Sequence, residues 1–128
     1  MTDGLKIRDC TGSVADVVGR LRDALQERRI EVFAVIDHAA GARGAGLTLR
    51  DEVLIVFGNP AVGTPLMQAD PTTGIELPLR MLVFDTDSGV RLAWRPPSRL
   101  ADRFELGTQI EVLRRLDDVM EGLAAAVR

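Results

Sequence analysis

The chain has 128 residues, of which 46% are hydrophobic and 27% are charged, and this composition suits one globular domain spanning residues 1–128. Its formal net charge of −3 and pI near 5.1 argue against nucleic-acid or membrane partners, because these require a clustered basic face. The one cysteine, Cys10, excludes an intrachain disulfide. No apolar run reaches the roughly 20 residues that cross a bilayer, and residues 1–6 show no apolar leader, so we expect a cytoplasmic protein.

The first predicted elements are a short strand and a helix. Residues 5–8 alternate apolar and charged side chains, which predicts a strand. Ser13 followed by Asp16 has the pattern of a capping box, and the apolar spacing that follows predicts an amphipathic helix from about Val14 to Arg28. The apolar face of this helix consists of Val14, Val17, Val18, Leu21 and Leu25.

Two continuous apolar runs follow the helix. Residues 32–36 are rich in β-branched side chains and predict a strand buried on both faces, which ends at Asp37 and His38. The Ala- and Gly-rich segment 39–46 is expected to hold a short helix. Residues 53–57 predict a second buried strand.

The segment from Asn59 to Leu77 predicts a long ordered loop. Pro60 ends the preceding strand because proline has no N–H to donate to a ladder. Loops this long are uncommon in compact domains and are usually functional or disordered. Order is favoured here because the segment has apolar anchors of its own, namely Val62, Leu66, Met67, Ile75 and Leu77.

The C-terminal third predicts a hairpin and a second long helix. Residues 79–84 and 90–95 predict two antiparallel strands, joined by a turn in which Gly89 takes a left-handed conformation. A short helical turn is expected from Ser98, and a long helix follows a second capping box. In the second strand Val90, Leu92 and Trp94 point to one face and Arg91 and Arg95 to the other, and the second capping box pairs Thr108 with Glu111.

Five strands and two main helices predict the α+β class. Long helices separated by an antiparallel run suit a two-layer sandwich. We therefore expect a mainly antiparallel five-stranded sheet with the two main helices on one face.

The chain resembles the family catalogued as domain of unknown function 302. The resemblance covers residues 13–104 and is carried by VFAVIDHA at 32–39, FGNP at 57–60 with GTPLM at 63–67, and LPLR at 77–80. It implies a compact β-α-β(4)-α fold and association as a homodimer. Many relatives have a basic residue after Gly-Asn-Pro, where this chain has Ala61, and Tyr where it has Trp94. The missing basic residue moves our expectation from an anion site towards a neutral pocket.

Our leading hypothesis is a small-ligand-binding domain whose pocket lies under the 59–77 loop. His38 is the only histidine and follows a strand, a place where binding residues often lie. Asn59, Thr64 and Gln68 supply polar groups along a mostly apolar cleft. We therefore predict His38, Asn59, Thr64 and Gln68 as ligand contacts.

An enzyme is the first alternative, with His38 as the catalytic general acid or base. Asp37 is its neighbour in sequence, although adjacent strand residues normally point to opposite faces. Cys10 is a further candidate nucleophile if it lies near His38. Met67 and His38 are residue types that ligate haem, but no metal-binding spacing is present, so we expect no metal and no cofactor.

A homodimeric interaction module is the second alternative. A free sheet edge, or the face that carries Val90, Leu92 and Trp94, would form the contact between the two copies.

Overall fold

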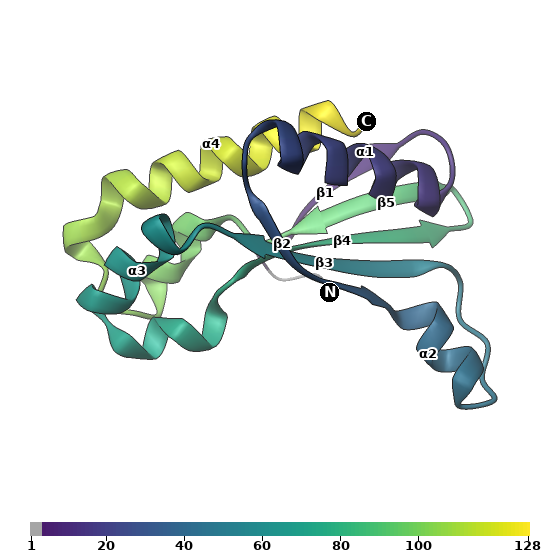
Figure 1. Cartoon of the computed structure of the whole chain (residues 1–128), viewed down its shortest axis with the longest axis horizontal. Coiled ribbons are helices and arrows are strands. Elements are labelled where there is room, and N and C mark those ends of the chain that lie inside the picture. The colour runs from purple at the N-terminus through teal and green to yellow at the C-terminus, as the bar shows by residue number, and fades with distance from the viewer. Residues whose placement is uncertain (1–3) are drawn as a thin grey trace.

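A computed structural model of the protein describes residues 4–128 and shows a five-stranded sheet in the order β1-β5-β4-β3-β2 (Figure 1). Every neighbouring pair of strands is antiparallel, as predicted. Met1 to Asp3, part of the segment considered above as a leader, lie outside the described residues. The strands are β1 (Lys6–Cys10), β2 (Glu31–Asp37), β3 (Glu52–Gly58), β4 (Leu79–Thr86) and β5 (Gly89–Trp94).

The two main helices lie side by side on one face of the sheet, which confirms the predicted α+β class (Figure 1). α2 projects from the end of β2, and α3 lies beyond the sheet, below the N-terminal part of α4. The α-helices are α1 (Val14–Glu27), α2 (His38–Gly44), α3 (Pro60–Ala69) and α4 (Ile110–Ala126), and the 3₁₀ helices are η1 (Pro71–Glu76), η2 (Pro97–Asp102) and η3 (Gly107–Gln109).

The main core lies between the sheet and the helices α1 and α4. Alternate residues of β3, β4 and β5 point into it because strand side chains have a period of two. Val90, Leu92 and Trp94 belong to this core and are almost fully buried. The hypothesis that their face binds a second copy is therefore wrong. The sheet residues of this core are Ile55, Phe57, Met81, Val83, Val90, Leu92 and Trp94.

The strand β2 is exposed, so the prediction that it is buried on both faces is wrong. It is the last strand of the sheet and pairs only with β3, and a bulge between Val32 and Ala34 interrupts that pairing. Phe33, Val35 and Ile36 are 45%, 39% and 42% exposed. An apolar run is typical of a central strand, but the position of a strand within the sheet depends on contacts that its own residues do not specify.

The predicted loop 59–77 is also wrong, because most of it folds as α3 and η1. Asn59 is the N-cap of α3, and its Oδ1 accepts a hydrogen bond of 2.9 Å from the backbone N–H of Ala61. Pro60 occupies the first helical turn, where its missing N–H has no cost. Pro65 lies inside the helix, which is the reason the segment did not look helical.

Only one of the two predicted capping boxes forms. The side chain of Ser13 accepts from the N–H of Asp16 at 3.1 Å, and Asp16 accepts from the N–H of Ser13 at 3.0 Å. At α4 the N-cap is Gln109, which makes no side-chain capping bond, and Glu111 pairs with Arg114 at 2.8 Å. The predicted Thr108 box is therefore wrong because η3 occupies that turn.

A second, smaller apolar cluster joins α3 to α4. Its fully or nearly fully buried members are Leu66, Leu106, Leu113 and Leu116. Burying a leucine side chain contributes about 2 kcal/mol, so this cluster fixes α3 firmly against α4. Asp70 adds a polar connection, because its Oδ2 accepts from the backbone N–H of Glu105 at 2.9 Å.

Candidate functional site

A cavity of about 230 Å³ lies where α3 and η1 meet the ends of β3 and β4. We call it the α3 cavity. Its walls are mostly apolar, and no charged side chain of residues 4–128 lines it. Its lining residues are Phe33, Gly58, Asn59, Pro60, Val62, Gly63, Thr64, Met67, Gly74, Leu77, Pro78, Leu79 and Leu116.

Two glycines leave the space in the α3 cavity that side chains would otherwise fill. A Cβ atom on Gly63 would lie 3.8 Å from Cδ1 of Leu77 and 4.0 Å from Cε of Met67. A Cβ atom on Gly74 would lie only 3.3 Å from Sδ of Met67. The thioether of Met67 therefore lies between the two glycines, and its flexibility lets this wall adapt to an occupant.

Two polar side chains reach the α3 cavity. Asn59 uses its Oδ1 as the helix cap, and its Nδ2 makes no hydrogen bond to any residue that the structure describes. The hydroxyl of Thr64 likewise has no hydrogen-bond partner among residues 4–128. Both residues are exposed, so these groups offer a donor and a donor–acceptor at the solvent side of a mostly apolar lining.

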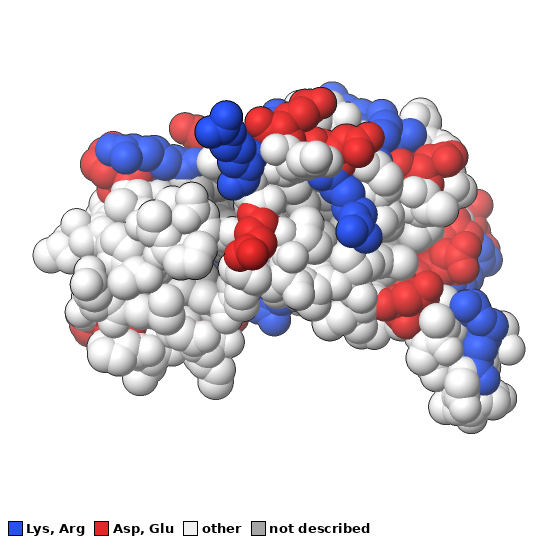
Figure 2. Space-filling model, viewed as in Figure 1, with Lys and Arg blue, Asp and Glu red and all other residues white. Residues whose placement is uncertain are grey.

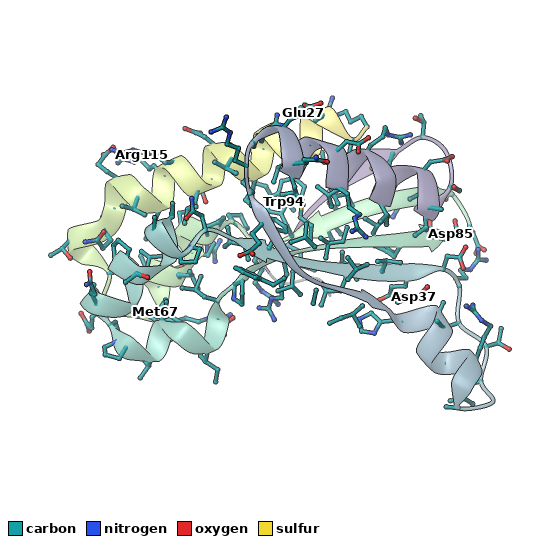
Figure 3. All side chains as sticks on the ribbon, in the orientation of Figure 1. Glu27, Asp37, Met67, Asp85, Trp94 and Arg115 are labelled. Carbon is teal, nitrogen blue, oxygen red and sulfur yellow. The ribbon has the colours of Figure 1, made fainter. Side chains whose placement is uncertain are left out.

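His38 does not line the α3 cavity. It begins α2 at the far end of β2, where Asp37 pairs with Val53, whereas Glu31 pairs with Gly58 beside the cavity. The six-residue separation along β2 amounts to about 20 Å. Figure 3 shows the corresponding separation between Asp37 and Met67.

The remaining predicted residues are also separate from the α3 cavity. Asp37 caps α2, with Oδ1 accepting from the N–H of Ala40 at 2.9 Å, so its carboxylate serves the helix terminus. Gln68 is exposed and is not part of the lining. The structure thus brings Asn59 and Thr64 together and leaves His38 and Gln68 apart from them.

Cys10 has the surroundings of an unreactive thiol. Partial burial raises its pKa, and the positive charge of Arg20 only partly opposes this effect. A raised pKa lowers the fraction of thiolate, the nucleophilic form. Within the part of the chain that the structure describes, no group of three or more His, Cys, Asp or Glu side chains is arranged to hold a metal ion.

Phe33 and Leu116 are lining residues that sequence reasoning did not identify as part of a site. Phe33 comes from the strand bulge and Leu116 from the apolar stripe of α4. Asn59 followed by Pro60 was the available signal for α3, because this pair is typical of a helix start. A helix over this segment places Val62 and Leu66 on one face, so the segment forms the side of a pocket and not a loop that covers it.

The chain matches the family model described as "Domain of unknown function DUF302" over residues 7–123. It is also similar in fold to a solved protein from Bacillus stearothermophilus, described as an uncharacterized conserved protein DUF302. The TM-score is 0.84 at 14% sequence identity, with 99% of this chain and 100% of the other covered.

Two relatives from Brucella are 41% identical to this chain over 110 residues. One is named fluoride-specific ion channel FluC 1, from Brucella suis biovar 1, and the other fluoride-specific ion channel FluC 2, from Brucella melitensis biotype 1. The match covers 85% of this chain and 43% and 41% of the two relatives, so this chain spans less than half of their length. Among residues 4–128, no helix has the length and apolar character needed to cross a membrane.

Proposed function

The chain belongs to the family described as "Domain of unknown function DUF302", a description that names no activity. We propose, from the α3 cavity, that the protein binds a small, neutral, mostly apolar molecule between α3 and η1. One observation carries this proposal. The α3 cavity is already formed and is lined mostly by apolar side chains, and the exposed residues Asn59 and Thr64 add polar groups to its lining. Binding sites of small molecules commonly combine these features.

The size of the α3 cavity limits the ligand. Its volume of about 230 Å³ is below the range of about 300–1,000 Å³ that is typical of sites for drug-sized molecules. An apolar cavity of about 150 Å³ accepts benzene. We therefore expect a ligand of about one ring, with a hydroxyl or carbonyl group that reaches Thr64 or Asn59.

Charge favours a neutral ligand. No ionised side chain of residues 4–128 lines the α3 cavity. An ion that enters it would lose hydration and would gain no opposite charge in return. In the view of Figure 2 the charged side chains gather over α1 and α4 and near α2, whereas the surface over α3 and η1 has few of them. Ala61, at the start of α3, adds no charge to this surface.

Thermal unfolding tests the proposal with phenol, toluene and protonated benzylamine at equal free concentrations. A ligand that binds only the folded state raises Tm, and at equal free concentration the rise is larger for the ligand of higher affinity. We expect phenol to raise Tm at least as much as toluene, and benzylamine to have no effect. The variant His38→Ala should give the same increases, because His38 lies outside the α3 cavity. An equal increase with benzylamine, or none with any compound, would refute the proposal.

A homodimer through β2 is the second candidate. The edge strand β1 carries Lys6, Arg8 and Asp9, and charges of this kind protect an edge from pairing. β2 has charges only at its ends, and its middle exposes Phe33 and Ile36. Antiparallel pairing of β2 with β2 of a second copy uses the same edge twice, as twofold symmetry requires.

The sequence alternative of an enzyme with His38 as general acid or base stays a prediction, and we assign no reaction to this residue. The names of the Brucella relatives do not supply one, because this chain spans less than half of those proteins.

A further inference from the structure

A second and larger cleft, of about 480 Å³, lies where β5 ends, between the sheet and η2. We call it the arginine cleft. Four arginines line it, although the chain as a whole has a formal net charge of −3. These arginines are Arg80 at the start of β4, Arg95 after β5, and Arg99 and Arg103 in and after η2.

Two carboxylates in the arginine cleft neutralise only part of this charge. Glu76 lies 3.3 Å from Nη2 of Arg80 and 3.9 Å from Nη1 of Arg103. Asp102 lies 2.8 Å from Nε of Arg99. Arg95 has no ion pair with any residue that the structure describes. Among residues 4–128, four guanidinium groups thus line the cleft with two carboxylates, and the donors of Arg95 are used by no ion pair.

Arg80 and Arg95 follow the last printed pair of the strands β4 and β5. Leu82 pairs with Ala93, and we infer that the same register, continued by two positions to one residue beyond the end of β5, brings Arg80 and Arg95 opposite each other. Like charges directly opposite in a sheet repel and destabilise it. A bound anion would remove this repulsion, since guanidinium groups bind carboxylate and phosphate with two parallel hydrogen bonds each.

The floor of the arginine cleft is apolar. Leu54, Leu82 and Ala93 are direct cross-strand neighbours and point away from the main core. This row begins immediately beside the pair Arg80 and Arg95. The cleft therefore offers positive charge at one end and an apolar surface leading away from it.

We propose that the arginine cleft binds an amphipathic organic anion, a carboxylate or phosphate group on a short hydrocarbon chain. Arg80 and Arg95 hold the head group, and the chain lies along Leu82, Ala93 and Leu54. This site is separate from the α3 cavity, so it does not depend on the function proposed above.

Leucine and methionine methyl groups report the two sites separately. Leu82 lies in the apolar floor of the arginine cleft, and Met67 lines the α3 cavity. With ¹³C-methyl leucine and methionine in the full chain, octanoate and octyl phosphate, both below their micelle concentrations, should shift the Leu82 signals in a saturable way and leave Met67 unchanged. The affinity should fall as salt is added, because the head-group contact is electrostatic.

The variant Arg95→Gln tests the head-group contact. It removes one charge without breaking an ion pair, and we expect affinity for octanoate to fall by about tenfold. The control Arg22→Gln changes an exposed arginine of α1 and should leave affinity unchanged. The Tm of Arg95→Gln should equal or exceed that of the wild type, since a repulsive contact is lost.

Neutral and simple ligands complete the experiment. Octanol, inorganic phosphate and fluoride at the same concentrations should each bind at least tenfold more weakly than octanoate, as about 1.4 kcal/mol of lost contact implies. Equal binding of octanol would show that the arginines do not contribute. Equal binding of phosphate or fluoride would show that the apolar row does not contribute. Each of these two results would overturn the proposal. A shift of Met67 in place of Leu82, or no binding of octanoate and octyl phosphate, would overturn it as well.

Discussion

The ring atom Cε2 of Phe33 lies 3.4 Å from the position that a Cβ atom on Gly58 would occupy. The bulged edge strand β2 therefore contacts the glycine at the start of the Gly58-Asn59-Pro60 turn. This contact gives Phe33 one side facing the α3 cavity and another side in solvent. It connects the exposed edge of the sheet to the wall of the proposed ligand site.

Replacing Phe33 tests this wall. Because Phe33 is 45% exposed, Phe33→Ala should lower the unfolding free energy by less than the 3–5 kcal/mol that is typical of a buried phenylalanine. It should weaken phenol binding by about fivefold, because one apolar wall is lost. Phe33→Leu should recover most of the affinity. Binding that is unchanged in Phe33→Ala would show that this ring does not form part of the site.

Filling the α3 cavity should separate stability from binding. Gly63→Ala adds a methyl group that makes ordinary van der Waals contact with Leu77 and Met67, and alanine has the better helix propensity, so we expect the unfolding free energy to rise by about 0.5–1 kcal/mol. Phenol binding should weaken because the volume is reduced. Gly19→Ala in α1 is the matched control, since a Cβ atom there meets nothing within 4 Å. It should stabilise the protein similarly and leave binding unchanged.

Thr73 carries a buried hydroxyl without a partner. Its side chain is fully buried, and Oγ1 makes no hydrogen bond to any described residue. Thr73→Val keeps the shape and removes the unpaired group, so urea denaturation should show a gain of about 1 kcal/mol. Its neighbour provides the contrast, because Oγ1 of Thr72 donates to Asp70 at 2.6 Å. Thr72→Val should destabilise the protein, and a loss of stability in Thr73→Val would contradict this account.

Asp70 should make stability depend on acid pH. Hydrogen bonds from the Thr72 hydroxyl and the Glu105 N–H lower the pKa of Asp70. A carboxyl whose pKa is lower in the folded state stabilises the protein above the unfolded pKa of about 3.9, and this contribution is lost as pH falls through the folded pKa. Asp70→Asn should therefore have a lower Tm than the wild type at pH 7, and the difference should shrink below pH 3.9. A difference that is constant with pH would exclude this linkage. Asp118→Asn, an exposed change on α4, should alter Tm little throughout.

The proposed β2 dimer is tested by light scattering at high micromolar concentration. The wild type should have the mass of two chains, and Ile36→Lys should be a monomer, because a charge in mid-strand opposes edge pairing. Leu47→Lys changes an exposed leucine outside the strand and should remain a dimer. A monomeric wild type would refute this interface.

Local signals were sufficient for the elements whose cause is local. The capping box of Ser13 and Asp16 begins α1, and Gly89 takes a φ of 114° in the hairpin turn, both as predicted. The burial of β2 was not predictable from its own residues because strand order is set by the whole sheet. α3 was missed because Gly63 and Pro65 interrupt a segment that tertiary packing of Leu66 makes helical.

The candidate site divides in the same way. Asn59 and Thr64 were predicted as polar groups along an apolar cleft, and both line the α3 cavity, while their role as ligand contacts stays a prediction. His38 was predicted because it follows a strand, but it lies at the opposite end of β2 from this cavity. The cavity itself depends on Phe33 and Leu116, which are distant in sequence and meet only in the folded chain.

The most direct test of the central claim is an NMR measurement of contacts between phenol and the ¹³C-labelled methyl group of Met67. Among residues 4–128, Met67 is the only methionine that lines the α3 cavity, so its signal, once assigned, identifies the site. We expect nuclear Overhauser contacts from the phenol ring to Met67 in the wild type, and a marked reduction in Gly63→Ala. Contacts to Met120 instead, or none to any methionine while phenol still binds, would contradict a ligand site under α3.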